Sequence, residues 1–153
     1  MKLTRIFLIC LLFAGAACDS RQALSENCEP TPHDEIGPFY RTGAPVRSRV
    51  GTGYLLKGRV LSVKGCEPLA GSRLEFWLAG PGGQYDDAHR ATVYADRQGF
   101  YRFESHRPPG YLGRPPHIHI MVNAAGHEPL ITQHYPQPEQ EKAEFNLVLA
   151  PRQ

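Results

Sequence analysis

Two closely spaced histidines carry the clearest chemical signal in the sequence. His117 and His119 lie in the run His-Ile-His-Ile-Met-Val, which contains β-branched residues and nothing that breaks an extended chain. Side chains alternate between the faces of a strand, so both imidazoles should point to one side and Ile118 and Ile120 to the other. Two imidazoles on one face, anchored by an apolar opposite face, predict half of a metal site. Just upstream, Arg114 is biased towards an extended backbone by the proline that follows it.

The other half of such a site needs further donors, and two tyrosines have suitable settings. Tyr85 follows Gly82 and Gly83, and Tyr111 follows Gly110, so both are expected on loops that can approach a metal without a packing role. Phenolate is a hard anionic donor, and only a strong Lewis acid keeps it deprotonated at neutral pH. Two phenolates with two imidazoles therefore suit ferric iron better than zinc, which favours Cys, His and carboxylate.

The elements that must position these residues are short strands separated by turns. About seven are expected, and no helical periodicity follows the first 17 residues. Strands this short and evenly spaced bury their apolar faces by stacking two sheets, which predicts an all-β fold, a single antiparallel β-sandwich. The expected strands are Tyr54–Val63, Ser72–Ala79, Thr92–Ala95, Phe100–Glu104, His117–Asn123, Leu130–Tyr135 and Glu144–Leu149.

The spacing of glycines and prolines indicates a fold but not a function. Gly58, the Gly65 to Gly71 turn with its Pro-Leu pair, and the stretch from Asp96 to Phe103 resemble transthyretin-like (prealbumin-like) sandwich modules. Such a module could bind a carbohydrate, a peptide or a protein without any chemistry. That alternative would not account for Arg114, the histidine pair or Gln133.

The chain as a whole resembles the intradiol ring-cleavage dioxygenases, non-haem Fe(III) enzymes that open catechols between the two hydroxylated carbons. The resemblance covers nearly all of residues 31–153, and its most specific part is Arg-Pro-Pro-His-Ile-His followed by Leu-Ile-Thr-Gln. It rests on Thr31-Pro32, Gly37-Pro38-Phe39-Tyr40, Arg114-Pro115-Pro116-His117-Ile118-His119 and Leu130-Ile131-Thr132-Gln133.

The resemblance implies a role for each candidate residue. Tyr85 and Tyr111 would be the equatorial and axial phenolate ligands of Fe(III), and His117 and His119 the equatorial and axial imidazoles. Arg114, Tyr111 and Gln133 would be catalytic, with Arg114 and Gln133 also contacting substrate. Tyr40 is a further candidate for substrate contact, although it could instead pin the segment before it to the domain.

The implied reaction inserts both atoms of O2 into a catechol-type aromatic diol and gives a muconate-type dicarboxylate, without an organic cofactor. Arg114 would supply fixed positive charge beside the ring. Tyr111 and Arg114 are only three positions apart, a shorter loop than in the well-known catechol and protocatechuate enzymes, so the substrate stays open. A zinc or copper site built from His117, His119 and another histidine is the remaining alternative. A visible absorption spectrum would distinguish an iron site from a zinc site, because phenolate bound to ferric iron absorbs visible light and a zinc site does not.

The first residues predict export. Lys2 and Arg5 precede an apolar run too short to span a bilayer as an ordinary helix, and small residues then lead to Cys18. Residues 1–17 are thus expected to be a signal peptide, with Cys18 lipidated as in bacterial lipoproteins, or the signal simply cleaved next to it. Residues 18–30 would be a tether to the catalytic sandwich of residues 31–153. The expected location is the bacterial cell envelope or periplasm, with membrane contact only through the lipid anchor.

Cysteine usage and charge agree with that compartment. Cys28 and Cys66 are the even pair left in the expected domain, and in an oxidising compartment they should form a disulfide. The formal net charge of +2 disappears when Lys2 and Arg5 leave with the signal. No basic run with interleaved aromatics occurs, so nucleic acid is not an expected partner.

Overall fold

The structure is a computed structural model that describes residues 28–110 and 113–153. The expected signal peptide, Cys18, most of the tether and Tyr111 lie outside the described residues. Within them, no helix could cross a membrane. The strands are β1 (Tyr54–Ser62), β2 (Arg73–Trp77), β3 (Arg90–Tyr94), β4 (Phe100–Ser105), β5 (Ile118–Asn123), β6 (Leu130–His134), β7 (Lys142–Glu144) and β8 (Leu147–Leu149), with one short 3-10 helix, η1 (Asp87–His89).

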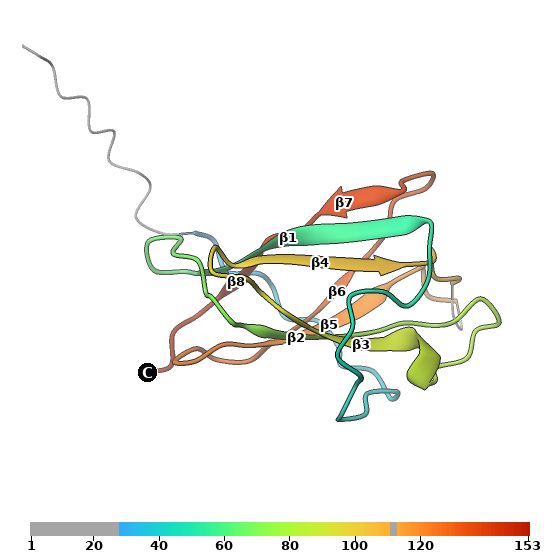
Figure 1. Cartoon of the computed structure of the whole chain (residues 1–153), viewed down its shortest axis with the longest axis horizontal. Helices are drawn as coiled ribbons and strands as arrows, with labels where there is room; N and C mark the ends of the chain where they lie inside the picture. Colours follow the sequence, from blue (N-terminus) through green and yellow to red (C-terminus); the bar gives the residue numbers. More distant parts are fainter. Residues whose placement is uncertain (1–27, 111–112) are drawn as a thin grey trace, which may run out of the picture.

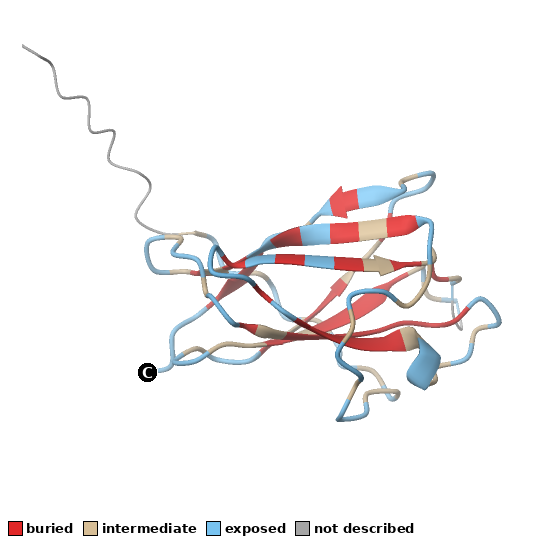
Figure 2. Cartoon of the chain, in the orientation of Figure 1, coloured by how far each residue is buried: buried red, intermediate tan, exposed pale blue. Residues whose placement is uncertain are grey.

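These strands form two stacked sheets, which confirms the predicted β-sandwich. One sheet has the order β4-β1-β7 with β8 also paired to β1, and the other has the order β3-β2-β5-β6. Figure 1 shows the two layers, with β1, β4 and β7 above β2, β3 and β5. The apolar core fills the space between them, and Figure 2 shows buried residues alternating with more exposed ones along β1.

The end of the chain differs from the expected single strand. The predicted Glu144–Leu149 strand is two strands, β7 and β8, and both pair with β1 in parallel, so the sandwich is not wholly antiparallel. The chain changes partner residues at Phe145, whose amide donates to the Lys57 carbonyl at 2.8 Å, and at Asn146, whose side chain accepts from the Arg59 amide at 2.9 Å. Between them Gly58 makes room, because a Cβ there would lie 2.1 Å from the Phe145 oxygen. This close approach of backbone to backbone explains the break.

The β3-β2-β5-β6 sheet has a covered outer face. Along β2, Leu74 and Phe76 point into the core, so Glu75 and Trp77 point outward, yet both are almost fully buried. Their cover is the segment of residues 28–47, called the strap here, which crosses this face before β1 begins. The sandwich therefore has a second, smaller interior between the strap and the sheet.

The strap is tied down at both ends. A disulfide joins Cys28 to Cys66 in the β1–β2 turn, the pair expected from the cysteine count. The Thr31 amide donates to the Val148 carbonyl at 3.1 Å, and the Arg47 amide to the Thr92 carbonyl at 3.1 Å. Because these bonds reach both edges of the domain, the strap is an ordered part of the fold.

A half-buried histidine on β6, bonded to a tyrosine of the other sheet, makes the stability of the fold depend on pH. The Tyr54 hydroxyl and His134 Nε2 hydrogen-bond at 2.6 Å, and burial lowers the pKa of His134 to about 4. The unfolded chain therefore binds a proton as pH falls below about 6.5, while the folded chain resists until about pH 4. Stability present at neutral pH is lost across this window, and for one such group the loss between pH 7 and pH 5 is about 2 kcal/mol.

We expect the variant His134→Gln to flatten this dependence when the free energy of unfolding of the metal-free protein is measured in urea at pH 7, 6 and 5. The pH dependence of the variant will not vanish entirely, because burial also lowers the pKa of His119. His127→Gln, on the β5–β6 turn, is the matched control and should keep the wild-type slope. An unchanged slope in His134→Gln would contradict the assignment.

Candidate metal centre

Strand β5 brings the two candidate histidines together as expected. His117 immediately precedes β5 and His119 is its second residue, with Ile118 and Ile120 fully buried in the core on the other face. The centroids of the two imidazole rings lie 4.8 Å apart, with the rings nearly perpendicular. Both histidines are buried, so their nitrogens face a protein-lined site and not bulk water.

His117 has one nitrogen occupied and one directed at a tyrosine. Its Nδ1 lies 2.8 Å from the Pro115 carbonyl, which can only accept, so Nδ1 carries the proton and Nε2 is left with a lone pair. Nε2 lies 3.3 Å from the Tyr85 hydroxyl oxygen. A backbone carbonyl that fixes the tautomer of an imidazole in this way is a usual feature of metal-binding histidines.

The ring of His119 is held in place by stacking on a neighbouring aromatic ring. Its ring stacks on Trp77, its direct neighbour on β2, with centroids 4.9 Å apart and planes 4° from parallel. Burial, and then the charge of neighbouring His117, lower the pKa of His119 to about 4, so the ring is neutral at physiological pH. Its Nδ1 is buried and finds no hydrogen-bond partner among the described residues. A neutral, rigidly packed imidazole with an unsatisfied nitrogen is suited to ligation.

Tyr85 reaches the site from the loop between β2 and β3. The turn before it closes with a hydrogen bond from the Gly80 amide to the Gln84 carbonyl at 2.7 Å. After it, Asp86 caps η1 by accepting from the Ala88 amide at 2.9 Å. The Tyr85 ring also stacks on Phe39 of the strap, with centroids 4.4 Å apart and planes 11° from parallel. The position of the phenol is therefore set from both sides of the loop and from the strap.

Arg114 completes the described part of the site. Its Nη2 donates to Gln133 Oε1 at 2.9 Å and to the Tyr135 hydroxyl at 3.2 Å. Arg114 also lines a cavity of about 190 Å³ together with the candidate ligands. The lining residues are Glu35, Gly37, Pro38, Phe39, Tyr85, Arg114, His117 and His119.

The donors present fit a metal ion of hard character. The structure brings Tyr85, His117 and His119 together, with a phenolic oxygen and an imidazole nitrogen at ligand-to-ligand distance. In residues 28–110 and 113–153, no group of three His, Cys, Asp or Glu side chains could hold a metal ion. The third donor beside the imidazoles is thus a phenol in the described part of the chain, which favours ferric iron over zinc. Tyr111, the expected second phenolate, is outside the described residues.

Two other candidates sit beside the cavity and do not line it. Gln133 is buried next to His119 in the sheet register and holds Arg114. The Tyr40 hydroxyl donates to Glu75 at 3.2 Å, and its ring packs on Trp77. Substrate contact by Tyr40 is therefore not supported by the cavity lining, and the pinning alternative matches the contacts.

Several residues of the site carry no chemical signal in the sequence. Phe39 and Gly37 come from the strap, and Asp34 and Tyr135 hydrogen-bond to each other at 2.8 Å behind Arg114. The positions of these four residues depend on contacts between segments far apart in the sequence, and Asp34 and Tyr135 are 101 positions apart. Only the Gly-Pro-Phe-Tyr run, already part of the family resemblance, gives a hint of the first two.

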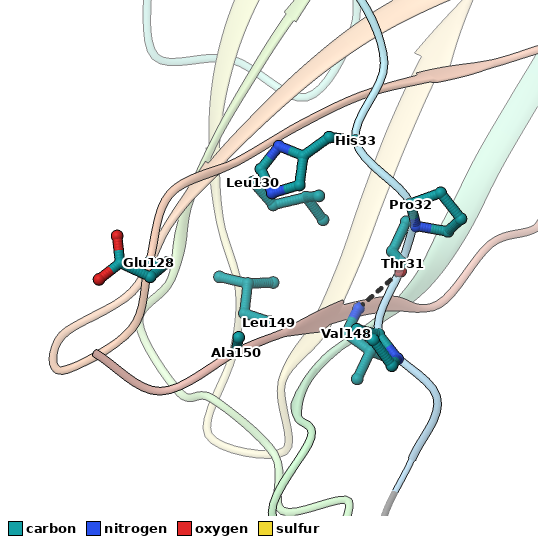
Figure 3. A pocket seen from close by; sticks show the side chains of 9 residues that line it. Thr31, Pro32, His33, Glu128, Leu130, Val148, Leu149 and Ala150 are labelled. Atoms are coloured by element: carbon teal, nitrogen blue, oxygen red, sulfur yellow. Dashed lines mark hydrogen bonds between the residues drawn. The ribbon is translucent and has the colours of Figure 1, made fainter. Parts of the chain in front are cut away.

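A larger cavity of about 380 Å³ lies elsewhere, between the start of the strap, β6 and β8. Figure 3 shows Leu130, Leu149 and Ala150 around it, with Val148 and Thr31 joined by a hydrogen bond at one side. None of the three described candidate ligands, Tyr85, His117 and His119, lines this cavity. Its described lining is mostly apolar, and no group of three His, Cys, Asp or Glu side chains among those residues could hold a metal ion.

Gly37 gives a direct test of the strap as the roof of the site. Its φ of +69° is costly for any residue with a Cβ, and an added Cβ would lie 3.0 Å from His119 Cε1. We expect Gly37→Ala to lower the free energy of unfolding by about 1–2 kcal/mol. By displacing the imidazole it should also weaken iron binding by about 10-fold in a titration.

The matched control is Gly43→Ala, also in the strap. Gly43 has a φ of +74°, but nothing lies within 4 Å of an added Cβ. This variant should show the backbone cost in stability and keep wild-type iron affinity. Equal iron affinities for the two variants would contradict the role of Gly37 as a close contact of His119.

Comparisons with known proteins identify the family of this chain. The family profile described as Dioxygenase (Dioxygenase_C) matches residues 36–150. This chain belongs to the intradiol ring-cleavage dioxygenase family. The match includes the strap from residue 36 onward, both sheets and every described candidate residue of the metal centre.

Curated relatives in this family are catechol-cleaving enzymes of greater length. Catechol 1,2-dioxygenase of Pseudomonas sp. (strain EST1001) is 30% identical over 151 residues, which cover 75% of this chain and 50% of that protein. Chlorocatechol 1,2-dioxygenase of Pseudomonas putida is 32% identical over 133 residues, covering 65% of this chain and 51% of that protein. The chain thus spans about half the length of these relatives.

Solved structures show the same intradiol dioxygenase fold. The dioxygenase domain of a dioxygenase–carbohydrate-binding protein fusion from Streptomyces sp. SirexAA-E has a TM-score of 0.73 at 27% identity, covering 81% of this chain and 100% of that one. The intradiol ring-cleavage dioxygenase from Tetranychus urticae has a TM-score of 0.74 at 17% identity, covering 82% and 97%, and shows the fold alone. Both of these chains align with this one over nearly their whole length.

Proposed function

We propose that this protein is an Fe(III)-dependent intradiol dioxygenase that cleaves a catechol-type aromatic between its two hydroxylated carbons to a muconate-type dicarboxylate. The observation that carries the proposal is the Tyr85 oxygen at 3.3 Å from His117 Nε2, with His119 alongside and Arg114 on the same cavity wall. Ferric iron, held by Tyr85, His117, His119 and, by family resemblance, Tyr111, would supply the Lewis acidity that makes an electron-rich diol reactive towards O2.

The cavity suits one aromatic ring. A dry cavity of about 150 Å³ is known to hold benzene, so the volume of about 190 Å³ accommodates a ring with two hydroxyl groups. Pro38 and Phe39 give the lining apolar surface for the ring, and the imidazoles and the Tyr85 phenol give it polar atoms. A diol would bind with its oxygens towards the metal held by these polar groups.

Arg114 is the residue that would stabilise charge on the substrate. A guanidinium is permanently protonated, and its hydrogen bonds to Gln133 and Tyr135 fix one of its nitrogens. A fixed cation at the wall of a small cavity stabilises negative charge that develops on the ring during the reaction, without reorganising. Tyr111, by family resemblance, would accept a proton from the incoming diol.

The test is a visible spectrum of the purified iron-loaded domain, recorded before and after anaerobic addition of catechol, followed by O2 uptake on admission of air. A reddish band that shifts to longer wavelength with catechol, and uptake of one O2 per diol, are expected. Tyr85→Phe combined with Tyr111→Phe should remove the band. The control variant Tyr94→Phe, which replaces an exposed tyrosine on β3, should keep the band. A colourless protein that takes up no ferric iron would leave a binding module on the same fold.

We also propose, from the sequence of residues 1–18 alone, that the protein is exported and anchored through a lipidated Cys18. Full-length protein produced in a bacterial host should partition into the detergent phase of a Triton X-114 extract, and Cys18→Ala should move it to the aqueous phase. Wild-type protein in the aqueous phase would indicate ordinary signal cleavage.

A further inference from the structure

The guanidinium of Arg114 is held by groups that stand behind the cavity wall. Its Nη2 donates to two acceptors, Gln133 Oε1 at 2.9 Å and the Tyr135 oxygen at 3.2 Å. Gln133 is buried, and neither acceptor lines the cavity. The orientation of the guanidinium in the described part of the cavity lining is thus set by residues that would not touch the substrate.

The Tyr135 hydroxyl has one hydrogen to give, and the geometry decides where it goes. Asp34 Oδ2 lies 2.8 Å away and Gln133 Oε1 lies 3.1 Å away. The Asp34 carboxylate is the closer of the two acceptors and carries a charge, so the Tyr135 hydroxyl donates its hydrogen bond to Asp34. Burial, and then the hydrogen bond and charge of Asp34, raise the pKa of Tyr135, which keeps it a protonated phenol. Its oxygen remains free to accept from Arg114.

A directed chain of hydrogen bonds results, from guanidinium to phenol to carboxylate. Each bond polarises the next, so the Asp34 charge makes the Tyr135 oxygen a stronger acceptor for Arg114. Asp34 also balances the charge of a half-buried arginine, which would otherwise be costly. The strap thereby supplies the counter-charge of the site.

Asp34 can do this because its backbone is fixed on the edge of β6. The Asp34 amide donates to the Ile131 carbonyl at 2.9 Å, and Gln133 Nε2 donates to the Glu35 carbonyl at 2.7 Å. The neighbouring Thr132 hydroxyl donates to the Pro32 carbonyl at 3.0 Å. Three consecutive β6 residues thus hold the strap at the point where its carboxylate meets Tyr135.

We propose that Asp34 and Tyr135 are positioning residues that fix the guanidinium of Arg114 at the cavity wall. The inference rests on the proposed function for its catalytic consequence, but the restraint on Arg114 is a property of the protein itself. Neither residue lines the cavity, so neither is assigned contact with substrate.

The kinetic test uses Tyr135→Phe and Asp34→Asn alone and each combined with Arg114→Gln. We expect each single variant to lower kcat by about 10- to 100-fold, since a misplaced catalytic group can cost that much, with KM changed by less than about 3-fold. In the Arg114→Gln background the same substitutions should cost almost nothing further, because residues that act through one group are not additive. Losses that simply multiply would overturn the proposal.

The second readout needs neither iron nor turnover. In ¹⁵N-labelled, metal-free protein, the side-chain Nη–H signals of Arg114, assigned by their absence in Arg114→Gln, should be resolved because rotation of the guanidinium is restrained. They should broaden beyond detection in Tyr135→Phe and weaken in Asp34→Asn. Unchanged signals in both variants would overturn the proposal even if activity fell.

Tyr101→Phe is the matched control. It also removes one phenol hydrogen bond, that of Tyr101 to the Phe145 carbonyl at 2.7 Å, but on the other sheet. Its Arg114 signals and kcat should match the wild type. If the wild-type protein cleaves no diol, the proposed function fails, and the Arg114 signals alone then decide whether Asp34 and Tyr135 position the guanidinium.

Discussion

Replacing His117 with alanine should abolish ring cleavage and iron retention while leaving the fold intact. The substitution removes the imidazole whose Nε2 faces the Tyr85 oxygen, and with it the Nδ1 bond to the Pro115 carbonyl. A bound metal supplies several kcal/mol of transition-state stabilisation, so the rate should fall by at least about 10³-fold. Iron content by elemental analysis and O2 uptake with catechol measure the two losses.

The fold should survive because the core is anchored by the residue that follows. Ile118 is fully buried on the opposite face and stays in place, so the urea midpoint of metal-free His117→Ala should remain close to that of the metal-free wild type. His127→Ala, on the β5–β6 turn, is the control: it loses a hydrogen bond to Ser62 of β1 and should keep iron and activity. Full iron content in His117→Ala would remove this residue from the metal centre.

Removing the disulfide should produce the largest change in stability. Cys28 and Cys66 are 38 positions apart, and closing a loop of that length in the unfolded chain contributes about 4 kcal/mol by loop-closure entropy. The double variant Cys28→Ser/Cys66→Ser should therefore lose about that much free energy of unfolding in urea. Catechol cleavage should fall far less, because the strap keeps its bonds to β6 and β8.

Treatment of the wild type with a reductant is the matching experiment and should reproduce the double variant. The reductant should have no further effect on the double variant itself. A loss below about 1 kcal/mol would mean that the bond is absent in the protein or that the unfolded chain is already compact near Cys28.

The histidine pair was predictable because the rule that governs it is local. Side chains two apart on a strand share a face whatever the rest of the fold does, and His117 and His119 obey this although β5 begins only at Ile118. The pairing of Cys28 with Cys66 was likewise accessible, since few alternatives existed. Local geometry and simple counting were sufficient in both cases.

The strap shows where such reasoning stops. Phe39 and Tyr40 are adjacent aromatic residues, and either could line the cavity. No periodicity in this segment indicates which of them does. The structure places Phe39 against Tyr85 and Tyr40 against Trp77. That choice is made by the β2 side chains beneath, above all by Glu75, which accepts from the Tyr40 hydroxyl. A contact 35 positions away in the sequence decided it.

The break between β7 and β8 was missed for a similar reason. The run from Glu144 to Leu149 has the composition of one strand, and nothing in it marks Phe145 as a crossing point. The signal lies in Gly58, on a strand nearly ninety positions earlier, where the missing side chain leaves space for the Phe145 carbonyl. Backbone contacts between distant segments are not encoded in either segment alone.

The bonds that hold the strap also limit the order in which parts of the chain can fold. Asp34 and Tyr135 are separated by 101 positions, and Thr31 and Val148 by 117, so the roof of the cavity cannot close until the last strands have emerged. The bond between Cys28 and Cys66 needs only the first 66 residues and can form well before that. An early covalent link would keep the waiting strap close to the growing sandwich, which shortens the search for its final partners on β6 and β8.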